Sequence, residues 1–208
     1  LFEDKHRDLW VCTCLGGLFR ISKQNLKNAP SGYCIADKTY TTEDGLKNMF
    51  INQIVQDKTG HIWMLLYNNG IQKLNPVTGE ISTFALPGPL AGIQPDFLMC
   101  DREGNVWIGC HNRILSVSPE TGDTDIITLE ESPDCGITSM TEAENSIWVS
   151  TTKGLWTIRK EGRKASRLRI ADRLFTSLYY DSRNRQVILG GNDGVGICSS
   201  SIIDEPEQ

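Results

Sequence analysis

The 208-residue sequence contains no hydrophobic run approaching the roughly 18 residues that a membrane-spanning helix needs, and no signal peptide opens it. Positive charge is also in short supply, since 21 Lys and Arg stand against 26 Asp and Glu. Nucleic-acid binding relies on clustered basic side chains, so the net charge of −5 argues against a nucleic-acid partner. The one basic stretch, residues 159–164, is expected to be a solvated turn.

Metal-binding patterns are also missing. The three histidines are scattered, and the seven cysteines include no C-x-x-C pair. We therefore predict no metal and no cofactor. Cys12 and Cys14 lie on the same face of an expected strand, a poor arrangement for a disulfide between them. The odd cysteine count leaves at least one thiol unpaired in a monomer, and we expect the cysteines to be small buried hydrophobic residues in strands.

No catalytic constellation is visible. Residues 190–196 are rich in glycine but lack the Gly-Lys-Ser/Thr ending of a phosphate loop, which favours a hairpin. Asp57 and Asp101 could be the carboxylate pair of a glycosidase. They recur at the same position of a repeat, however, so a role in a turn is favoured, and we predict no catalytic residue.

The sequence does contain a repeat. Asp57–Trp63 and Asp101–Trp107 are its clearest copies, and looser copies end at Trp10, Trp148 and Ile188. These end points are spaced by 53, 44, 41 and 40 residues. A period near 40 predicts a stacked or radial repeat architecture in which neighbouring units bury each other's apolar faces.

Each repeat reads as an antiparallel meander. In the third, the expected strands are 97–100, 106–110, 114–118 and 124–129, and the Asp and Gly of the motif suit a tight hairpin between the first two. The fifth repeat shows three clear strands. The Gly-His and Trp-Asp signatures of WD40 repeats are missing. We predict structural anchors at these positions: Trp10, Asp57, Gly60, Trp63, Asp101, Gly104, Trp107 and Trp148.

The predicted fold is therefore all-β, a β-propeller of four-stranded antiparallel blades in which tryptophan fills the space between sheets. About five blades are expected, and part of a seven-bladed propeller is favoured over an open arc or a five-bladed ring. Residues 1–208 form a single propeller fragment with a tail at 204–208, and the chain reads as a piece of something longer. The expected blades are 1–42, 43–88, 89–132, 133–172 and 173–203.

Residues 42–48, running into 51–63, resemble the two-component regulator propeller repeat. That family has a D-G-L-x-x-N lead-in, then D-x-x-G-x-x-W-I-G, then G-L-x-R. The last element is also matched by 17–20 and 154–156, and the resemblance covers nearly the whole chain. Two departures are Arg113, which replaces the usual glycine before Ile114, and 186–191, where the tryptophan is lost.

The resemblance implies an extracytoplasmic sensor of a hybrid two-component system. Such proteins typically combine two seven-bladed propellers with an immunoglobulin-like domain, a membrane helix, a histidine kinase, a receiver and a DNA-binding module. We expect this chain to be a non-catalytic periplasmic segment of such a histidine kinase, which detects a glycan fragment and controls polysaccharide-utilisation genes through a phosphorelay. Two alternatives stay open: a structural or dimerisation propeller without its own ligand, and a propeller lyase or glycosidase.

A ligand site is predicted where the second strand of each repeat joins the third, because loops on one rim of a scaffold carry recognition residues. Tyrosine can stack on a sugar, and the polar side chains can bond its hydroxyls. The expected partners are an oligosaccharide or other small solute, and a second copy or further blades that cover open sheet faces; a membrane contact comes only through the full-length receptor. The candidate residues are Tyr67, Asn68, Asn69, His111, Asn112, Arg113, Lys153, Asn192 and Asp193.

Overall fold

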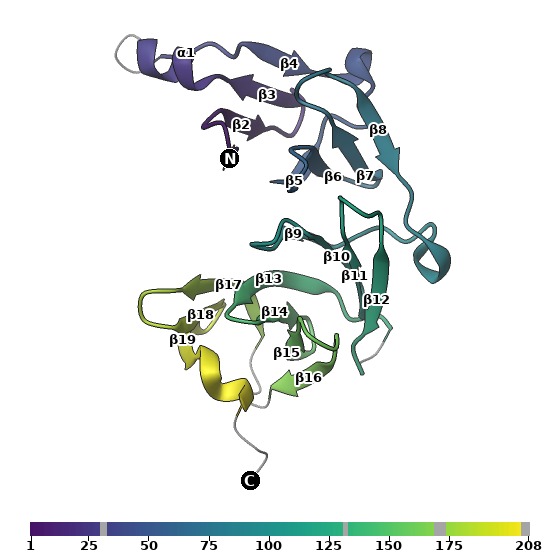
Figure 1. Cartoon of the computed structure of the whole chain (residues 1–208), viewed down its shortest axis with the longest axis vertical. Coiled ribbons are helices and arrows are strands. Elements are labelled where there is room, and N and C mark those ends of the chain that lie inside the picture. The colour runs from purple at the N-terminus through teal and green to yellow at the C-terminus, as the bar shows by residue number, and fades with distance from the viewer. Residues whose placement is uncertain (30–32, 131–132, 169–173, 205–208) are drawn as a thin grey trace. The chain divides into compact units, whose positions relative to one another are not determined.

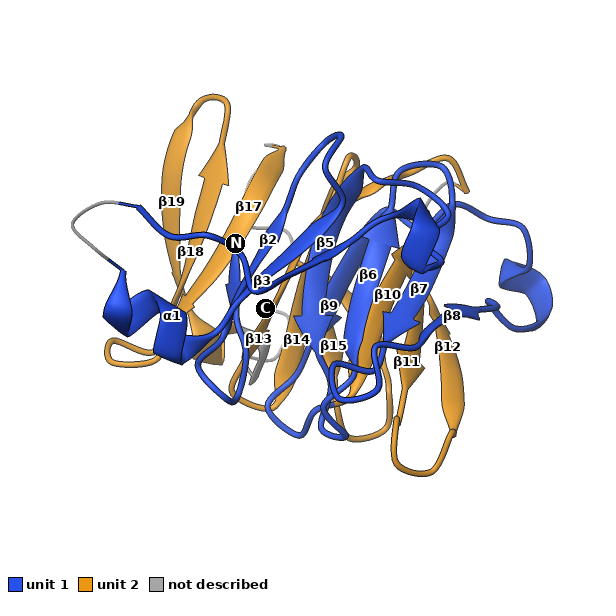
Figure 2. Cartoon of the chain, turned by 90° about the horizontal axis from the view of Figure 1, so that it is seen from above, with its two compact units in different colours: residues 1–104 blue, residues 105–208 orange. Residues whose placement is uncertain are grey.

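The computed structural model describes residues 1–29, 33–130, 133–168 and 174–204. The chain divides into two compact units, Leu1–Gly104 and Asn105–Gln208, which Figure 2 distinguishes by colour. The expected blade boundaries after residues 132 and 172 fall on or beside residues outside the described ranges, as does the expected tail from 205 onward. The single-propeller boundaries therefore stay a prediction.

Unit 1 is built from short strands joined by turns (Figure 1). Its first sheet has the order β1-β2-β3-β4 and its second the order β5-β6-β7-β8, so both are antiparallel meanders of strands consecutive in sequence. The elements are β1 (Phe2–Glu3), β2 (Leu9–Cys12), β3 (Leu18–Ile21), α1 (Lys23–Asn28), β4 (Lys38–Tyr40), η1 (Thr42–Asp44), β5 (Ile51–Gln56), β6 (Ile62–Leu66), β7 (Gly70–Leu74), β8 (Ile81–Phe84), η2 (Gly88–Leu90) and β9 (Phe97–Cys100).

The two sheets of unit 1 pack face to face over an apolar core. Trp10 and Leu18 of the first sheet cluster with Ile62, Met64 and other residues of the second, and these four are fully buried. Burying side chains of this size stabilises a fold by roughly 1.5–3 kcal/mol each. The tryptophan at the end of the first repeat thus fills the space between two neighbouring meanders.

The connection between β3 and β4 contains α1, a six-residue helix that the sequence pattern did not indicate. The Ser22 hydroxyl caps it by accepting a hydrogen bond from the backbone N–H of Asn25 at 3.2 Å. None of its residues is buried. A helix of this length without a buried face shows no apolar period, so the capping serine is its main signal in the sequence.

Unit 2 continues the meander pattern. Its sheets have the orders β12-β11-β10, β13-β14-β15-β16 and β17-β18-β19. Its elements are β10 (Val106–Cys110), β11 (Arg113–Val117), β12 (Thr124–Thr128), β13 (Ile137–Ala143), β14 (Ser146–Thr151), β15 (Gly154–Arg159), β16 (Ala165–Leu168), β17 (Phe175–Asp181), β18 (Gln186–Gly191), β19 (Gly194–Ser199) and η3 (Ser200–Asp204).

In the second, third and fourth repeats, the second strand is the most buried. Every residue of β6, β10 and β14 is buried, so these strands are covered on both faces. A strand covered on one face alternates between apolar and polar residues, whereas one covered on both is apolar almost throughout. This accounts for the continuous apolar run in Ile62–Leu66.

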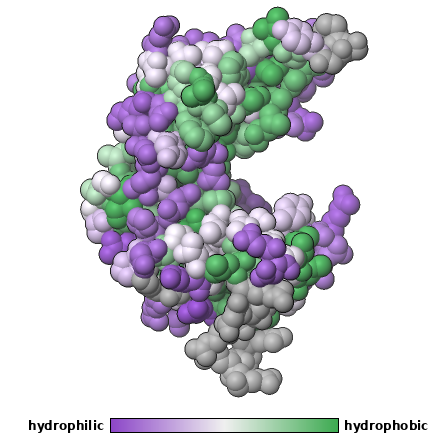
Figure 3. All heavy atoms as spheres, turned by 180° about the vertical axis from the view of Figure 1, so that it is seen from behind, coloured by the Kyte–Doolittle hydropathy of each residue, from purple (hydrophilic) through white to green (hydrophobic). Residues whose placement is uncertain are grey.

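The last sheet differs because one of its faces is open. Its inner face carries Val187, Leu189 and Cys198, which cluster with Trp148 of the preceding sheet. The opposite face carries a cross-strand row in which Tyr179 pairs with Ile188 and Ile188 with Ile197. Tyr179 is 65% exposed and Ile197 61%. Figure 3 shows hydrophobic residues reaching the surface among polar ones.

Among the described residues, antiparallel meanders of strands consecutive in sequence follow one another along the chain. The predicted fold class is confirmed: the protein is nearly all-β and has the architecture of a partial β-propeller. None of the helices among the described residues has the length and apolar character that crossing a membrane demands.

Candidate functional site

The predicted residues of unit 1 lie on the loop between β6 and β7. Tyr67 is 49% exposed, and its ring stacks on that of Phe50, with centroids 5.1 Å apart and planes 19° apart. The Asn48 side-chain amide donates to the Tyr67 carbonyl at 2.8 Å and to Asn69 Oδ1 at 3.1 Å. The loop is therefore held in place, and an exposed aromatic ring stands beside polar groups.

Asn68 borders a hollow of about 370 Å³ that is also lined by Phe84 and Gln94. Asn68 adopts a left-handed conformation with φ 53°, which asparagine tolerates better than most residues. Gln94 makes a hydrogen bond at each end of this loop. Its side-chain oxygen accepts from Gly70 N–H at 3.1 Å, and its side-chain amide donates to the Leu66 carbonyl at 3.1 Å. The structure thus brings Tyr67, Asn68 and Asn69 together on one loop.

The hairpin between β10 and β11 explains why Arg113 can replace a glycine. Here Cys110 pairs with Arg113, which leaves a two-residue turn with His111 in the left-handed conformation at φ 56°. Between β6 and β7 the turn is one residue longer, and Gly70 takes a positive φ of 66°. The backbone therefore does not need glycine at Arg113, and a role for this side chain in ligand binding stays a prediction, as do those of His111 and Asn112.

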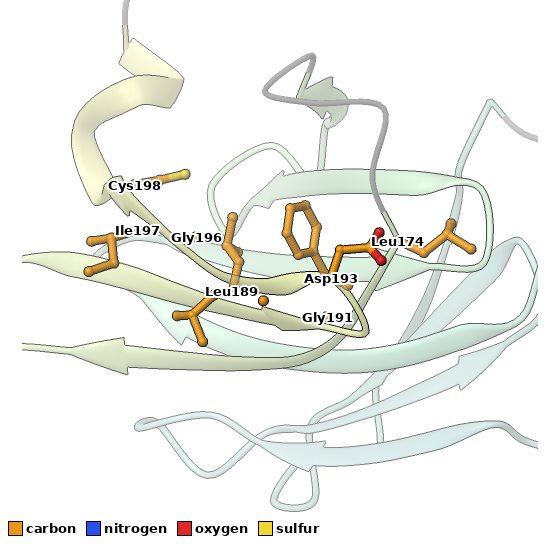
Figure 4. Close-up of a pocket in the computed structure, with 10 residues that line it drawn as sticks. Leu174, Leu189, Gly191, Asp193, Gly196, Ile197 and Cys198 are labelled. Carbon is orange, nitrogen blue, oxygen red and sulfur yellow. The ribbon is translucent and has the colours of Figure 1, made fainter.

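Lys153, Asn192 and Asp193 are exposed residues on two separate hairpins of unit 2. The Lys153 carbonyl accepts from Arg167 Nη2 at 2.9 Å. Asp193 stands at the tip between β18 and β19, at the edge of a cavity of about 240 Å³. Figure 4 shows this cavity running from Ile197 and Cys198 to Asp193 and Leu174. Its lining is mainly apolar, and Asp193 is the charged residue among those that line it.

The anchor residues show a hydrogen-bond pattern that sequence reasoning missed. Asp57, 3% exposed, accepts from the indole Nε1 of Trp63 at 2.7 Å while its other oxygen accepts from His61 N–H at 3.0 Å. Asp4 repeats this: it accepts from Trp10 Nε1 at 2.9 Å and from the backbone N–H of Asp8 at 3.0 Å. One carboxylate thus shapes the hairpin and satisfies the buried indole. In the sequence, this bond is signalled by the six-residue spacing between the aspartate and the tryptophan.

The remaining anchors are buried side chains or turn glycines. Trp107 and Trp148 are fully buried, and Asp101 is 5% exposed. Gly60 and Gly104 have φ values of 94° and 82°, the region where a glycine is favoured. A side chain at Gly104 would also meet the backbone of Lys58 at 2.9 Å.

The prediction that the cysteines are buried strand residues is wrong for Cys14, Cys34 and Cys135, which all lie outside strands. Cys14 is exposed because β2 ends at Cys12, whereas Cys110 and Cys198 are buried strand residues as predicted. Desolvation by burial raises the pKa of the Cys12 thiol to about 11, so it is a poor nucleophile near neutral pH. No group of metal-ligating side chains occurs within the described ranges.

The basic stretch 159–164 is not simply a solvated turn. The Arg163 guanidinium lies 4.7 Å from the ring centroid of Trp107, a cation–π geometry. Lys160 Nζ lies 2.8 Å from Glu142 Oε1, with both side chains largely buried. These two side chains turn inward because tertiary packing offers each a partner, which their local sequence does not reveal.

Comparison with solved structures shows that the chain is similar to extracellular domains of bacterial proteins. It is 41% identical, with a TM-score of 0.88 over 100% of its length, to the extracellular domain assigned as the hybrid two-component system BT4673 of B. thetaiotaomicron. The extracellular domain of BT3049, from the same organism, is 19% identical to this chain, with a TM-score of 0.79 over 99% of the chain. The chain spans 28% of the length of each.

A more distant match shows the fold alone. Virginiamycin B lyase from Staphylococcus aureus, in a catalytically inactive form with quinupristin, has 15% identity and a TM-score of 0.67. The match covers 97% of this chain and 69% of the lyase. No family model and no curated protein matches the chain.

Proposed function

Since the chain belongs with the propeller repeats found in the extracellular domains of hybrid two-component systems, we propose that it is a non-catalytic, ligand-binding segment of such a sensor. The observation that carries this proposal is the 41% identity over the full chain. The lyase likeness, at 15% identity, supports only a shared fold.

The proposed ligand is a glycan fragment that binds at the β6–β7 loop. Tyr67 offers an exposed ring already stacked on Phe50, which holds its plane fixed. Asn68 and Asn69 lie next to it and can both donate to and accept from hydroxyl groups. A fixed aromatic plane beside amides suits a sugar, which has an apolar ring face and a polar rim. The other predicted rim residues extend the proposal to unit 2.

The whole receptor's activity is also part of the proposal. It would be a periplasmic sensor anchored in the membrane outside this segment, whose histidine kinase controls polysaccharide-utilisation genes through a phosphorelay. The support is the kind of protein to which the matched extracellular domains are assigned. We further propose that the exposed row of Tyr179, Ile188 and Ile197 is covered by further blades or a second copy, because apolar faces of this kind favour association.

Calorimetric titration of the full chain with a panel of plant and host oligosaccharides tests the proposal. We expect binding by the native chain and a loss of at least about tenfold in affinity for Tyr67→Ala, since the variant lacks the stacking plane. Tyr33→Ala is the matched control, because Tyr33 is 70% exposed and lies outside the loop.

Two results would contradict the proposal. The first is the absence of binding to any oligosaccharide, which would favour a structural or dimerisation propeller. The second is turnover of a bound glycan, which would favour a lyase or glycosidase.

A further inference from the structure

We propose that unit 2 holds a second sugar site, a polar pocket that takes a single neutral, hydroxyl-rich ring. It deepens the proposed function and rests on it, since glycan sensing supplies the ligand class. The pocket has a volume of about 260 Å³. Its principal lining residues are Glu144, Asn145, Arg159, Glu161, Arg185 and Ser200.

The pocket lies at the hairpin ends opposite to the predicted rim. It is formed by the β13–β14 turn, the β15–β16 turn, the β17–β18 turn and the start of η3. Strand β14 begins beside Glu144 and Asn145 and ends before Lys153, and β18 begins beside Arg185 and ends before Asn192. The two candidate sites of unit 2 are therefore at opposite ends of the same strands.

Two of the lining side chains are pre-organised. Glu144 and Arg185 both have left-handed backbones, with φ 53° and 52°, a conformation in which long side chains are uncommon. Arg185 Nε donates to Glu144 Oε1 at 3.0 Å, and the Tyr180 hydroxyl bonds to the same oxygen. The side chains of Arg185 and Glu144 are 69% and 39% exposed. An ion pair that is this exposed to solvent adds little stability. A binding role explains the left-handed, hydrogen-bonded geometry of the pair better than stability does.

Ser200 provides an independent pointer to a ligand. It is 2% exposed and lines the pocket, and its hydroxyl has no hydrogen-bond partner in the described part of the chain. Its backbone N–H donates to the Arg185 carbonyl at 3.0 Å, which fixes it beside the β17–β18 turn. Buried hydroxyl groups are normally bonded, so this one calls for an acceptor or donor from outside the protein.

The balance of charges identifies the class of ligand. Two arginines and two glutamates line the pocket, so their formal charges cancel and neither an anion nor a cation is preferred. The lining also includes Ser146 and Ser201, so every lining residue is polar. A sugar hydroxyl can donate to a carboxylate and accept from a guanidinium, so neighbouring hydroxyls fit both. The volume lies below the usual range for drug-sized ligands, roughly 300–1,000 Å³, which indicates one ring.

Backbone NMR titration of the full chain with D-galactose and D-glucose tests the inference, with D-galacturonate as an anionic probe and glycine as a zwitterionic probe. We expect a neutral sugar to shift signals of Asn145, Arg185 and Ser200. Arg185→Asn should weaken this binding at least about tenfold, because it removes a charged donor while asparagine keeps the left-handed turn. Arg183→Asn, on the same turn but outside the lining, should bind as the native chain does.

Ser200→Ala separates binding from folding. Because the hydroxyl has no partner in the described part of the chain, its removal should leave the unfolding midpoint unchanged or higher. The same substitution should lower the affinity for the sugar. The inference is overturned if neither neutral sugar shifts these signals, if galacturonate or glycine binds more tightly, or if all three variants bind equally. Sugar-induced shifts confined to residues 67–69 would overturn the second sugar site while leaving the proposed function intact. The absence of shifts with any oligosaccharide would overturn both the second site and the proposed function.

Discussion

The β5–β6 hairpin of unit 1 and the β13–β14 hairpin of unit 2 each bury a tryptophan at the same place in the repeat, but they treat its indole N–H differently. Trp63 donates to Asp57 at 2.7 Å, whereas Trp148 Nε1 has no partner in the described part of the chain, and both rings are fully buried. Six residues before Trp148 stands Glu142, whose carboxylate pairs with Lys160 instead.

This difference separates two roles of the motif. The tryptophan ring is kept in both hairpins because it fills the space between sheets, and large buried aromatic rings contribute most of the packing. In the β5–β6 hairpin, the carboxylate of Asp57 accepts from the indole. In the β13–β14 hairpin, the carboxylate of Glu142 pairs with Lys160 instead. A buried N–H without a partner costs about 1–3 kcal/mol, which the packing of the ring evidently offsets.

The largest expected effect comes from removing the carboxylate of the first hairpin. Asp57→Ala should lower the free energy of unfolding by about 3 kcal/mol, because it leaves the indole of Trp63 and the backbone N–H of His61 unsatisfied. Urea denaturation followed by tryptophan fluorescence measures this. Asp193→Ala, at an exposed hairpin tip, is the control and should stay within about 0.5 kcal/mol of the native chain. Equal losses in both variants would remove the special role of Asp57.

A matched pair of substitutions tests the two indoles directly. Trp63→Phe and Trp148→Phe delete the same ring volume, but only the first also breaks a bond to a carboxylate. We expect Trp63→Phe to cost about 1.5–3 kcal/mol more than Trp148→Phe. Urea denaturation of the two variants measures this difference in the free energy of unfolding. If Trp148→Phe proves the costlier change, then the Trp148 N–H has a partner in solution.

The smallest effect concerns the fifth repeat, whose hairpin has lost the tryptophan. The side chain of Asn184, followed by the N–H groups of Arg183 and Asn184, lowers the pKa of Asp181 below its ordinary 3.8. A lowered folded-state pKa contributes stability above 3.8 that is lost as the pH falls through the folded value.

Asp181→Asn should therefore slightly flatten the decline of the unfolding midpoint in acid. Thermal melts from about pH 5 down to about pH 2 measure this slope. A steeper decline in the variant would show that Asp181 does not stabilise its turn.

Much of the fold follows from local patterns. Of the strands expected in the third repeat, two begin and end where β9 and β10 do. The third is shifted by one residue at both ends relative to β11, and the fourth ends one residue after β12. Turn residues and continuous apolar runs carry this information within a few positions. The candidate site was less predictable, because Gln94, which supports the Tyr67 loop, lies 24 residues from its partner Gly70.

The amino-acid sequence alone determined the repeated hairpins and the tryptophans that separate the sheets, because turn chemistry and strand burial are encoded over a few neighbouring residues. Only the tertiary structure decided which polar groups meet. Arg185 reaches Glu144 across 41 residues, and the Arg163 guanidinium lies over Trp107. Such contacts depend on how folded strands pack against one another, and no local pattern specifies them.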